Sequence, residues 1–284
     1  MPRAPQGTLG LVLATLLQAA RRRVRLARFM GVDAFDLVAR RRPPLTPPRA
    51  LVEAVGGYDF HIVGQHLSDI ATNFGALKPH ERLLDIGCGV GRLAVPLTHY
   101  LTTGEYTGFD LSRRAIRWCR KSIAYSHPNF WFAHADIANS HYNPRGALLP
   151  ESFRFPCADQ SVDIAFAASV FTHLEPASAD HYLAETARVL KPGGRAVLSF
   201  FLFDPQLISR LGGFYPKFAH FPQPYYAVAD QGDPEAAVAY DAAAVAEALR
   251  AKGLAVVRIA NGHWAQHPDP LSYQDFVLAQ RAAA

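Results

Sequence analysis

The sequence predicts an α/β fold, a doubly wound and mainly parallel sheet of seven strands, preceded by a basic helical extension. Strand-like and helix-like segments alternate from Arg82 to the end of the chain, which is typical of βαβ units. A glycine-rich turn follows the first of these strands. Half of the 284 residues are hydrophobic and 19% are charged, so the chain can bury a core and does not have the composition of a disordered protein.

The predicted elements follow one another in a regular order. Strand-like segments lie at 82–86, 105–109, 130–135, 162–167, 195–201, 255–259 and 275–280. Helix-like segments lie between them, at 92–100, 112–124, 179–189 and 242–251. Seven strands without an internal repeat predict a single domain over residues 51–284.

The positive charge of the chain is concentrated at its start. Residues 1–50 hold ten arginines against Asp33 and Asp36, a local charge of +8, so with +5 overall the other 234 residues sum to −3. Binding of a phosphate backbone needs Lys and Arg spread over the contact face. We therefore expect no nucleic-acid partner for the body of the chain.

Residues 8–20 form an apolar run that arginines follow. The run is shorter than the roughly 20 residues that cross a bilayer, and its charge stands on the wrong side for a secretory signal. Three roles stay open for this arm: a basic helix packed on the domain, a partner-binding helix, or a helix whose residues 8–30 contact an anionic membrane surface. Four prolines in residues 42–50 predict an extended spacer that ends the arm at residue 50.

The number and spacing of the cysteines indicate the cellular compartment and whether a zinc site is expected. Three cysteines with no C-x-x-C pair predict neither a disulfide framework nor a zinc site. A reducing, cytoplasmic location is expected, with membrane association as the open alternative.

The first predicted strand runs into Asp85 and three alternate glycines, at 87, 89 and 91. Such glycines permit a tight turn and let a ligand approach the backbone closely. A dinucleotide fingerprint needs its third glycine where Arg92 stands, which argues against a nicotinamide oxidoreductase. The carboxylate of Asp85 suits a cationic ligand group, and a tight turn without a ligand is the alternative.

The next two predicted strands also end in aspartates. Asp110 can accept hydrogen bonds from both hydroxyls of a ribose. Asp136 can accept from an exocyclic amine, with the backbone N–H of Ile137 beside it. Both aspartates could instead cap helices. A glycine turn, a diol acceptor and an amine acceptor, in this order, match the parts of an adenosyl amino acid.

These motifs together resemble the class I S-adenosylmethionine-dependent methyltransferases. The segments that carry the resemblance lie at 84–92, 108–110, 134–137, 155–163, 169–174 and 188–194. A lead-in at 56–60 and a segment at 262–264 resemble a bacterial group of these enzymes. The resemblance covers about residues 58–281 and implies the Rossmann-like methyltransferase fold with S-adenosylmethionine as methyl donor.

The resemblance also implies a set of cofactor-binding residues. Asp85, Gly87 and Gly89 would hold the methionine end, Asp110 the ribose, and Asp136 with Ile137 the adenine. Ser169 would approach the methionine end from the fourth strand, and Tyr58 would cover the cofactor. The implied set is completed by Cys88, Arg92 and Leu111.

The acceptor class follows from what the chain lacks. An enzyme that methylates amino groups of nucleic acids carries Asp/Asn-Pro-Pro-Tyr/Phe at the position where residues 168–171 of this chain read Ala-Ser-Val-Phe. Cys157 lies before the fourth strand, so we interpret it as a turn residue. We expect methyl transfer to oxygen or nitrogen of a small molecule by in-line displacement, with His173 as the candidate general base or a structural histidine.

The aromatic and proline-rich segment 203–240 is expected to be an acceptor lid, or else a satellite hydrophobic cluster. The alternative function is a non-catalytic cofactor-binding regulatory or membrane-associated protein that keeps the fold.

Overall fold

The computed structural model describes residues 25, 27–36, 38–208 and 213–283, in two compact units that meet between Phe60 and His61. This division lies ten residues after the boundary that the proline spacer predicts. The apolar run at 8–20 lies outside the described residues, so membrane contact through 8–30 stays a prediction. Within the described part of the chain, no helix combines the length and the hydrophobicity that a membrane span requires.

In the first unit, Arg49 forms ion pairs with two acids of the basic arm. Residues 27–36 are helical, and Arg49 begins the short helix α2 (Arg49–Ala54). The Arg49 guanidinium lies 2.8 Å from Asp33 Oδ1 and 2.6 Å from Asp36 Oδ2. These carboxylates raise the pKa of Arg49. The two acids of the basic arm therefore fold it back onto Arg49, near the end of the proline spacer, where α2 begins.

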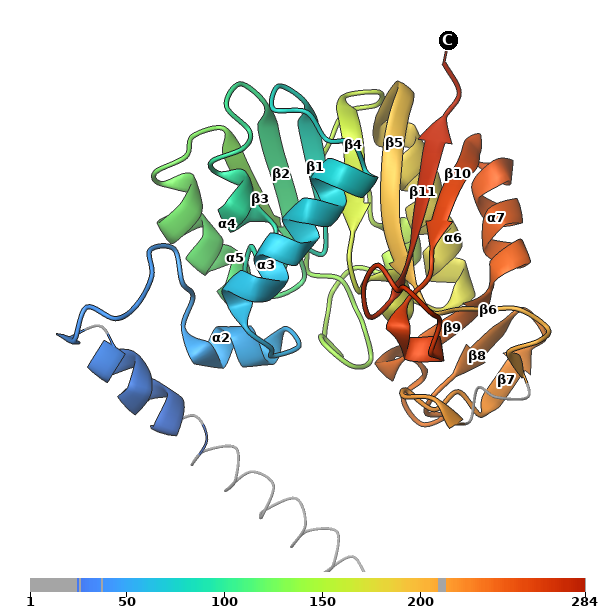
Figure 1. Cartoon of the computed structure of the whole chain (residues 1–284), viewed down its shortest axis with the longest axis horizontal. Coiled ribbons are helices and arrows are strands. Elements are labelled where there is room, and N and C mark those ends of the chain that lie inside the picture. The colour runs from blue at the N-terminus through green and yellow to red at the C-terminus, as the bar shows by residue number, and fades with distance from the viewer. Residues whose placement is uncertain (1–24, 26, 37, 209–212, 284) are drawn as a thin grey trace, which may run out of the picture. The chain divides into compact units, whose positions relative to one another are not determined.

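The second unit is built on a seven-stranded sheet in the order β10-β11-β5-β4-β1-β2-β3 (Figure 1). Its strands are β1 (Arg82–Ile86), β2 (Glu105–Asp110), β3 (Phe130–His134), β4 (Val162–Ala167), β5 (Leu190–Phe200), β10 (Leu254–Ala260) and β11 (Asp275–Arg281). The first five are parallel to one another, and β11 is antiparallel to both of its neighbours. The predicted doubly wound, mainly parallel sheet is confirmed.

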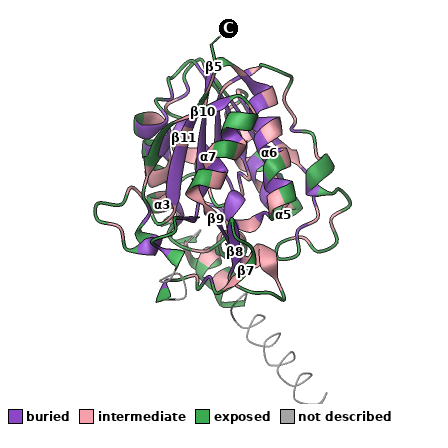
Figure 2. Ribbon diagram, turned by 90° about the vertical axis from the view of Figure 1, so that its right-hand side faces the viewer, coloured by how far each residue is buried: buried purple, intermediate pink, exposed green. Residues whose placement is uncertain are grey.

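Helices cover both faces of this sheet because successive side chains of a strand point to opposite sides. On one face, strand residues such as Leu83, Tyr106 and Phe166 pack with the π-helical turn η1 (Ile70–Phe74), α4 (Ala94–Leu97) and α5 (Arg113–Cys119). On the other, residues such as Leu84, Phe109 and Leu198 pack with α6 (Pro176–Val189) and α7 (Ala242–Ala251). Figure 2 shows the buried strands behind helices whose outer sides are exposed.

Most predicted boundaries agree with the structure. The helix predicted at 92–100 is shorter, since only α4 is α-helical there, and two other differences have local causes. α6 begins at Pro176, three residues before the predicted start, because proline fits the first turn of a helix. β5 begins at Leu190 although residues 191–194 read as a turn. The register between β4 and β5 shifts there, and Gly193 takes a φ of +75°, so a bulge absorbs the turn within the strand.

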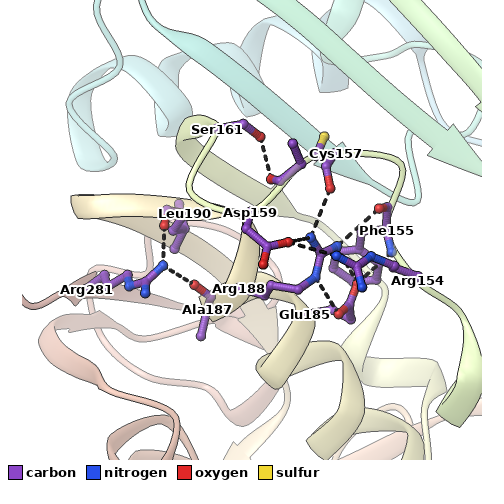
Figure 3. A network of polar contacts seen from close by, with 11 residues as sticks. Arg154, Phe155, Cys157, Asp159, Ser161, Glu185, Ala187, Arg188, Leu190 and Arg281 are labelled. Carbon is purple, nitrogen blue, oxygen red and sulfur yellow. Dashed lines mark hydrogen bonds and ion pairs between the residues drawn. The ribbon is translucent and has the colours of Figure 1, made fainter.

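Arg188 fastens the segment before β4 to the end of α6 (Figure 3). Its guanidinium forms two hydrogen bonds of 2.7 Å with Glu185 and one of 2.6 Å with Asp159. It also donates to the carbonyl oxygen of Cys157 at 3.0 Å. Burial raises the pKa of the Cys157 thiol to about 11, so this cysteine is a protonated turn residue and no nucleophile at neutral pH.

The segment predicted as a lid contains a second, four-stranded sheet in the order β6-β9-β8-β7. Its strands are β6 (Leu202–Phe203), β7 (His220–Gln223), β8 (Tyr226–Val228) and β9 (Val238–Asp241). The side chains of Phe201, Phe214, Phe218 and Trp264 form a buried aromatic cluster against it. The satellite cluster is therefore present, while the role of 203–240 as an acceptor lid stays a prediction.

Asp275 joins the small sheet to the large one. Its carboxylate is 1% exposed and accepts from Leu202 N at 2.7 Å, Gly262 N at 2.6 Å and Trp264 Nε1 at 2.6 Å. Asp275→Asn turns an amide NH₂ toward these donors, so we expect the free energy of unfolding to fall by about 2 kcal/mol in urea titrations at pH 7. The exposed Asp269→Asn is the control, and an equal loss in both variants would contradict this role.

Candidate active site

The candidate site lies at the carboxyl ends of β4, β1, β2 and β3, which are adjacent in the sheet. Ile86 pairs with Phe109 and with Ala167, and Asp110 pairs with His134, so the four strands end at nearly one level. From β1 the chain continues to β2 on one side, while β4 lies on the other. Ligands of open α/β sheets bind at such a reversal of strand order.

The glycine turn is fixed to β2 by its backbone. The N–H groups of Gly87 and Cys88 both donate to the carbonyl oxygen of Phe109, at 2.9 and 3.0 Å. Gly87 has a φ of +72°, and a Cβ there would lie 2.5 Å from Val170 Cγ2. Glycine is therefore required at 87 by conformation and by the close approach of the loop after β4.

Asp110 connects this turn to the start of α5. Its Oδ2 accepts from Gly89 N at 2.9 Å and its Oδ1 from Ser112 N at 2.7 Å. The N-cap of α5 is Ser112, whose Oγ accepts from Ala115 N, so Asp110 is not that cap. Burial raises the pKa of Asp110, against the two N–H donors, which lower it. Each carboxylate oxygen keeps a second lone pair, so the residue can still accept two hydroxyls.

Asp85 is a buried acid beneath the same turn. It is 4% exposed, and the Tyr106 hydroxyl donates to its Oδ2. Burial raises the pKa of Asp85 to about 7; the Tyr106 hydrogen bond opposes this and the charge of Asp110 adds to it. A cationic group would stabilise the ionised form of such a carboxylate. This environment therefore fits the amino group of an amino acid.

Asp136 points toward the loop that follows β3. Its Oδ1 accepts from Asn143 Nδ2 at 3.0 Å, and the same amide donates to Ile137 O at 2.9 Å. Residues 137–149 form bridges and turns, so the structure gives Asp136 no helix to cap. The N–H of Ile137 donates to Ala135 O at 2.9 Å and its side chain is buried, so a bond from this N–H to adenine would have to be shared.

The loop after β4 brings Ser169 to the same edge. Ser169 has a φ of +56°, its N–H donates to Ser199 Oγ at 2.7 Å, and its Oγ accepts from Gln274 Nε2 at 2.8 Å. Sequence reasoning missed Ser199 and Gln274. The available signal for Ser199 was a polar residue inside the otherwise apolar end of β5.

The remaining predicted contact residues have mixed surroundings. Cys88 is 6% exposed and its side chain faces the core, where burial raises the thiol pKa. Arg92 lies half-buried directly after the glycine turn. The carbonyl of Leu111 accepts from His134 Nε2 at 3.2 Å, which accounts for that histidine. Tyr58 belongs to the other unit and is 82% exposed, so its place over the cofactor stays a prediction.

His173 is enclosed by the loop after β3 and by the segment before β9. Its Nδ1 lies 2.8 Å from Glu235 O, which can only accept, so Nδ1 carries a proton and Nε2 is free of one in the neutral ring. Nε2 lies 3.4 Å from the Tyr142 hydroxyl. Burial lowers the pKa of His173, against the Glu235 bond, so the ring is neutral at pH 7. Its neighbour His141 binds Asp233 Oδ2 through Nδ1 at 2.7 Å.

In the part of the chain that the structure describes, no group of three or more His, Cys, Asp or Glu residues could hold a metal ion.

Comparison with known proteins gives a family for this arrangement. Residues 83–194 match a family model described as a methyltransferase domain. The chain is 32% identical over 114 residues to phthiotriol/phenolphthiotriol dimycocerosates methyltransferase 1 of Mycobacterium ulcerans, covering 40% of this chain and 35% of that protein. It is 29% identical over 123 residues to malonyl-[acyl-carrier protein] O-methyltransferase of Methylococcus capsulatus, covering 43% and 38%.

The fold likeness extends further along the chain than the sequence likeness. A putative sarcosine dimethylglycine methyltransferase from Galdieria sulphuraria superposes with a TM-score of 0.53 at 13% identity, over 82% of this chain and 97% of that one. The matches to the two curated relatives span little more than a third of those proteins. The matched segment contains the glycine turn, Asp110 and Asp136, and ends at the bulge of β5. The chain therefore contains a class I S-adenosylmethionine-dependent methyltransferase domain.

Proposed function

We propose that the chain binds S-adenosylmethionine at the carboxyl ends of β1, β2 and β3 and transfers its methyl group to oxygen or nitrogen of a small molecule. The observation that carries the proposal is the environment of Asp110, whose carboxylate holds the glycine turn at Gly89 and keeps lone pairs for two hydroxyls. The raised pKa of Asp85, caused by burial, supports a cationic amino group beside it.

The chemistry of the transfer sets what the protein has to do. When bound, S-adenosylmethionine supplies a methyl group on a sulfonium, which is an activated leaving group. The chain has to hold donor and acceptor in line and exclude water. Asp85 would orient the amino-acid end and Asp110 the ribose, while Asp136 would flank the adenine.

A hydroxyl or a protonated amine must lose a proton when it is methylated, and His173 is the residue that we propose to take it. Its ring is neutral at pH 7, and the bond from Nδ1 to Glu235 leaves Nε2 as the proton acceptor. The name of one relative, an O-methyltransferase, supports oxygen as one of the two candidate atoms. A cytoplasmic location, with peripheral membrane contact through the arginine-rich arm, belongs to the same proposal on sequence grounds.

Isotope transfer tests the function directly. The protein is incubated with methyl-labelled S-adenosylmethionine and a small-molecule extract of its host cells, which is then fractionated. We expect label in a small-molecule fraction and none in protein or nucleic acid. Binding of S-adenosylhomocysteine without any transfer would favour the non-catalytic alternative, and absence of binding would refute the proposal.

His173→Asn tests the proton acceptor. We expect the transfer rate to fall about 100-fold, because general-base catalysis typically contributes at least that much. The affinity for S-adenosylhomocysteine, measured by calorimetry, should stay unchanged, since His173 acts on the acceptor. The control is His99→Asn, because His99 is an exposed histidine two residues after α4. A structural role for His173 would instead lower the melting temperature and leave the rate of the folded fraction intact.

A further inference from the structure

Three side chains from different parts of the chain close a ring of hydrogen bonds beside β4. Ser169 N donates to Ser199 Oγ at 2.7 Å, and the Ser199 hydroxyl donates to Gln274 Oε1 at 2.7 Å. Gln274 Nε2 completes the ring by donating to Ser169 Oγ at 2.8 Å. Because Ser199 Oγ accepts from a backbone N–H, its own proton goes to Gln274, which fixes the amide orientation.

The ring holds a backbone conformation that serine rarely adopts. Ser169 has a φ of +56°, in the left-handed region where a side chain with a Cβ is strained. Such conformations persist where the surroundings over-determine them, and they concentrate at ligand sites. Ser199 is fully buried and Gln274 is half-buried, so both partners of Ser169 are held by packing.

The loop that carries this strain touches the glycine turn. Val170 directly follows Ser169, and its Cγ2 lies 2.5 Å from the position that a Cβ on Gly87 would take. Ser199 is also at the level of the strand ends, because Ala167, the last residue of β4, pairs with Leu198. The ring therefore lies next to the contact between the loop after β4 and the glycine turn.

We propose that Gln274 is a positioning residue, which holds Ser169 in its left-handed conformation so that the loop after β4 binds the amino-acid end of the cofactor. The inference rests on the proposed function, because it assigns a part to a residue of the same site. Gln274 itself acts through Ser169, and the same amide lies 3.5 Å from Thr172 Oγ1 in that loop.

Two ligands that differ only at the amino-acid end separate this role from a general structural one. Calorimetry on the full chain compares S-adenosylhomocysteine with methylthioadenosine, which has the nucleoside but no amino acid. For Gln274→Ala we expect the Kd for S-adenosylhomocysteine to rise about 10-fold and the Kd for methylthioadenosine to change less than 2-fold. Ser169→Ala should show the same selective loss.

Two further variants keep the test decisive. Gln274→Met retains the side-chain length without the amide, and it replaces Gln274→Ala if that variant does not fold. Gln280→Ala is the matched control, since this exposed glutamine lies on β11, the strand that begins directly after Gln274, and donates to Gly193 O at 3.0 Å away from the site.

The outcomes divide cleanly. Equal losses for both ligands, or an unchanged Kd for S-adenosylhomocysteine, would overturn the positioning role while leaving the proposed function standing. Wild-type protein that binds methylthioadenosine as tightly as S-adenosylhomocysteine would overturn it too, because no amino-acid end would then be recognised. Wild-type protein that binds neither ligand would overturn both proposals.

Discussion

Asp110→Ala is expected to weaken binding of S-adenosylhomocysteine about 100-fold or more. The carboxylate would lose hydrogen bonds from two ribose hydroxyls, each worth about 1.5 kcal/mol or more because the acceptor is charged. The variant would also remove the acceptor of Gly89 N, which holds the glycine turn at 2.9 Å. Calorimetry at pH 7.5 measures the change in Kd.

Two variants show whether this loss belongs to the ligand contact. Asp110→Asn keeps one carbonyl oxygen, so it can accept one hydroxyl, and we expect an intermediate loss of affinity. Glu105→Ala lies at the other end of β2, where Glu105 pairs with Arg82 at 3.2 Å on the surface, and it should leave the Kd unchanged. Retention of wild-type affinity by Asp110→Ala would remove the central observation behind the proposed function.

The sequence was sufficient for the sheet and for the aspartates at its edge. Parallel strands end at one edge, so Asp85, Asp110 and Asp136 could be assigned to a common region once their strands were recognised. The structure ends the four strands at nearly one level, as this reasoning requires. What these side chains bind is still a prediction, but their neighbourhood followed from local pattern alone.

The sequence was insufficient where a contact joins distant segments with no periodic signal. Gln274 is 105 residues from Ser169, and Asp233 is 92 residues from His141. The local sequence around Gln274 or Asp233 has no pattern that predicts these hydrogen-bond partners. The strands of the small sheet are two to four residues long, too short for alternation to separate them from a loop.

The N–H of Ile137 illustrates a different limit. Its position after β3 suggested a donor for adenine, yet in the structure it donates to Ala135 O two residues earlier. A tight turn of this kind depends on the following loop, which Asn143 ties back to Asp136. The side chains that fix such a turn lie outside any strand motif, so the hydrogen-bond partner of the Ile137 N–H could not be predicted from the sequence.

Asp85→Asn is expected to stabilise the protein at pH 8. Burial raises the pKa of Asp85 from 3.8 to about 7, so the folded state keeps its proton where the unfolded chain has lost it. The contribution of this group to stability therefore falls as pH rises from about 4 to about 7, and it is lowest above pH 7. At about 1.4 kcal/mol per pKa unit, the ionised carboxylate costs about 4 kcal/mol.

Asparagine carries no charge, and its carbonyl can still accept from Tyr106. We therefore expect the free energy of unfolding to rise by about 2 kcal/mol or more at pH 8, and the gain to shrink by more than half at pH 5. Urea titrations at the two pH values measure it. Asp163→Asn is the control, and its free energy of unfolding should change in the opposite direction. Burial raises the pKa of Asp163, but Lys191 and the Arg82 N–H outweigh it, so the pKa is lowered. The ionised carboxylate therefore stabilises the fold, and this variant should lose stability.

The same substitution should cost affinity for the cofactor, because stability and binding make opposite demands on Asp85. An ammonium group beside the carboxylate favours its ionised form, so wild-type affinity for S-adenosylhomocysteine should fall as pH drops from 8 to 6. Binding at pH 6 should release a proton, seen as a heat that depends on the buffer. Asp85→Asn should bind weakly with no such dependence. If it instead binds as tightly as wild type, Asp85 is not the partner of the amino group.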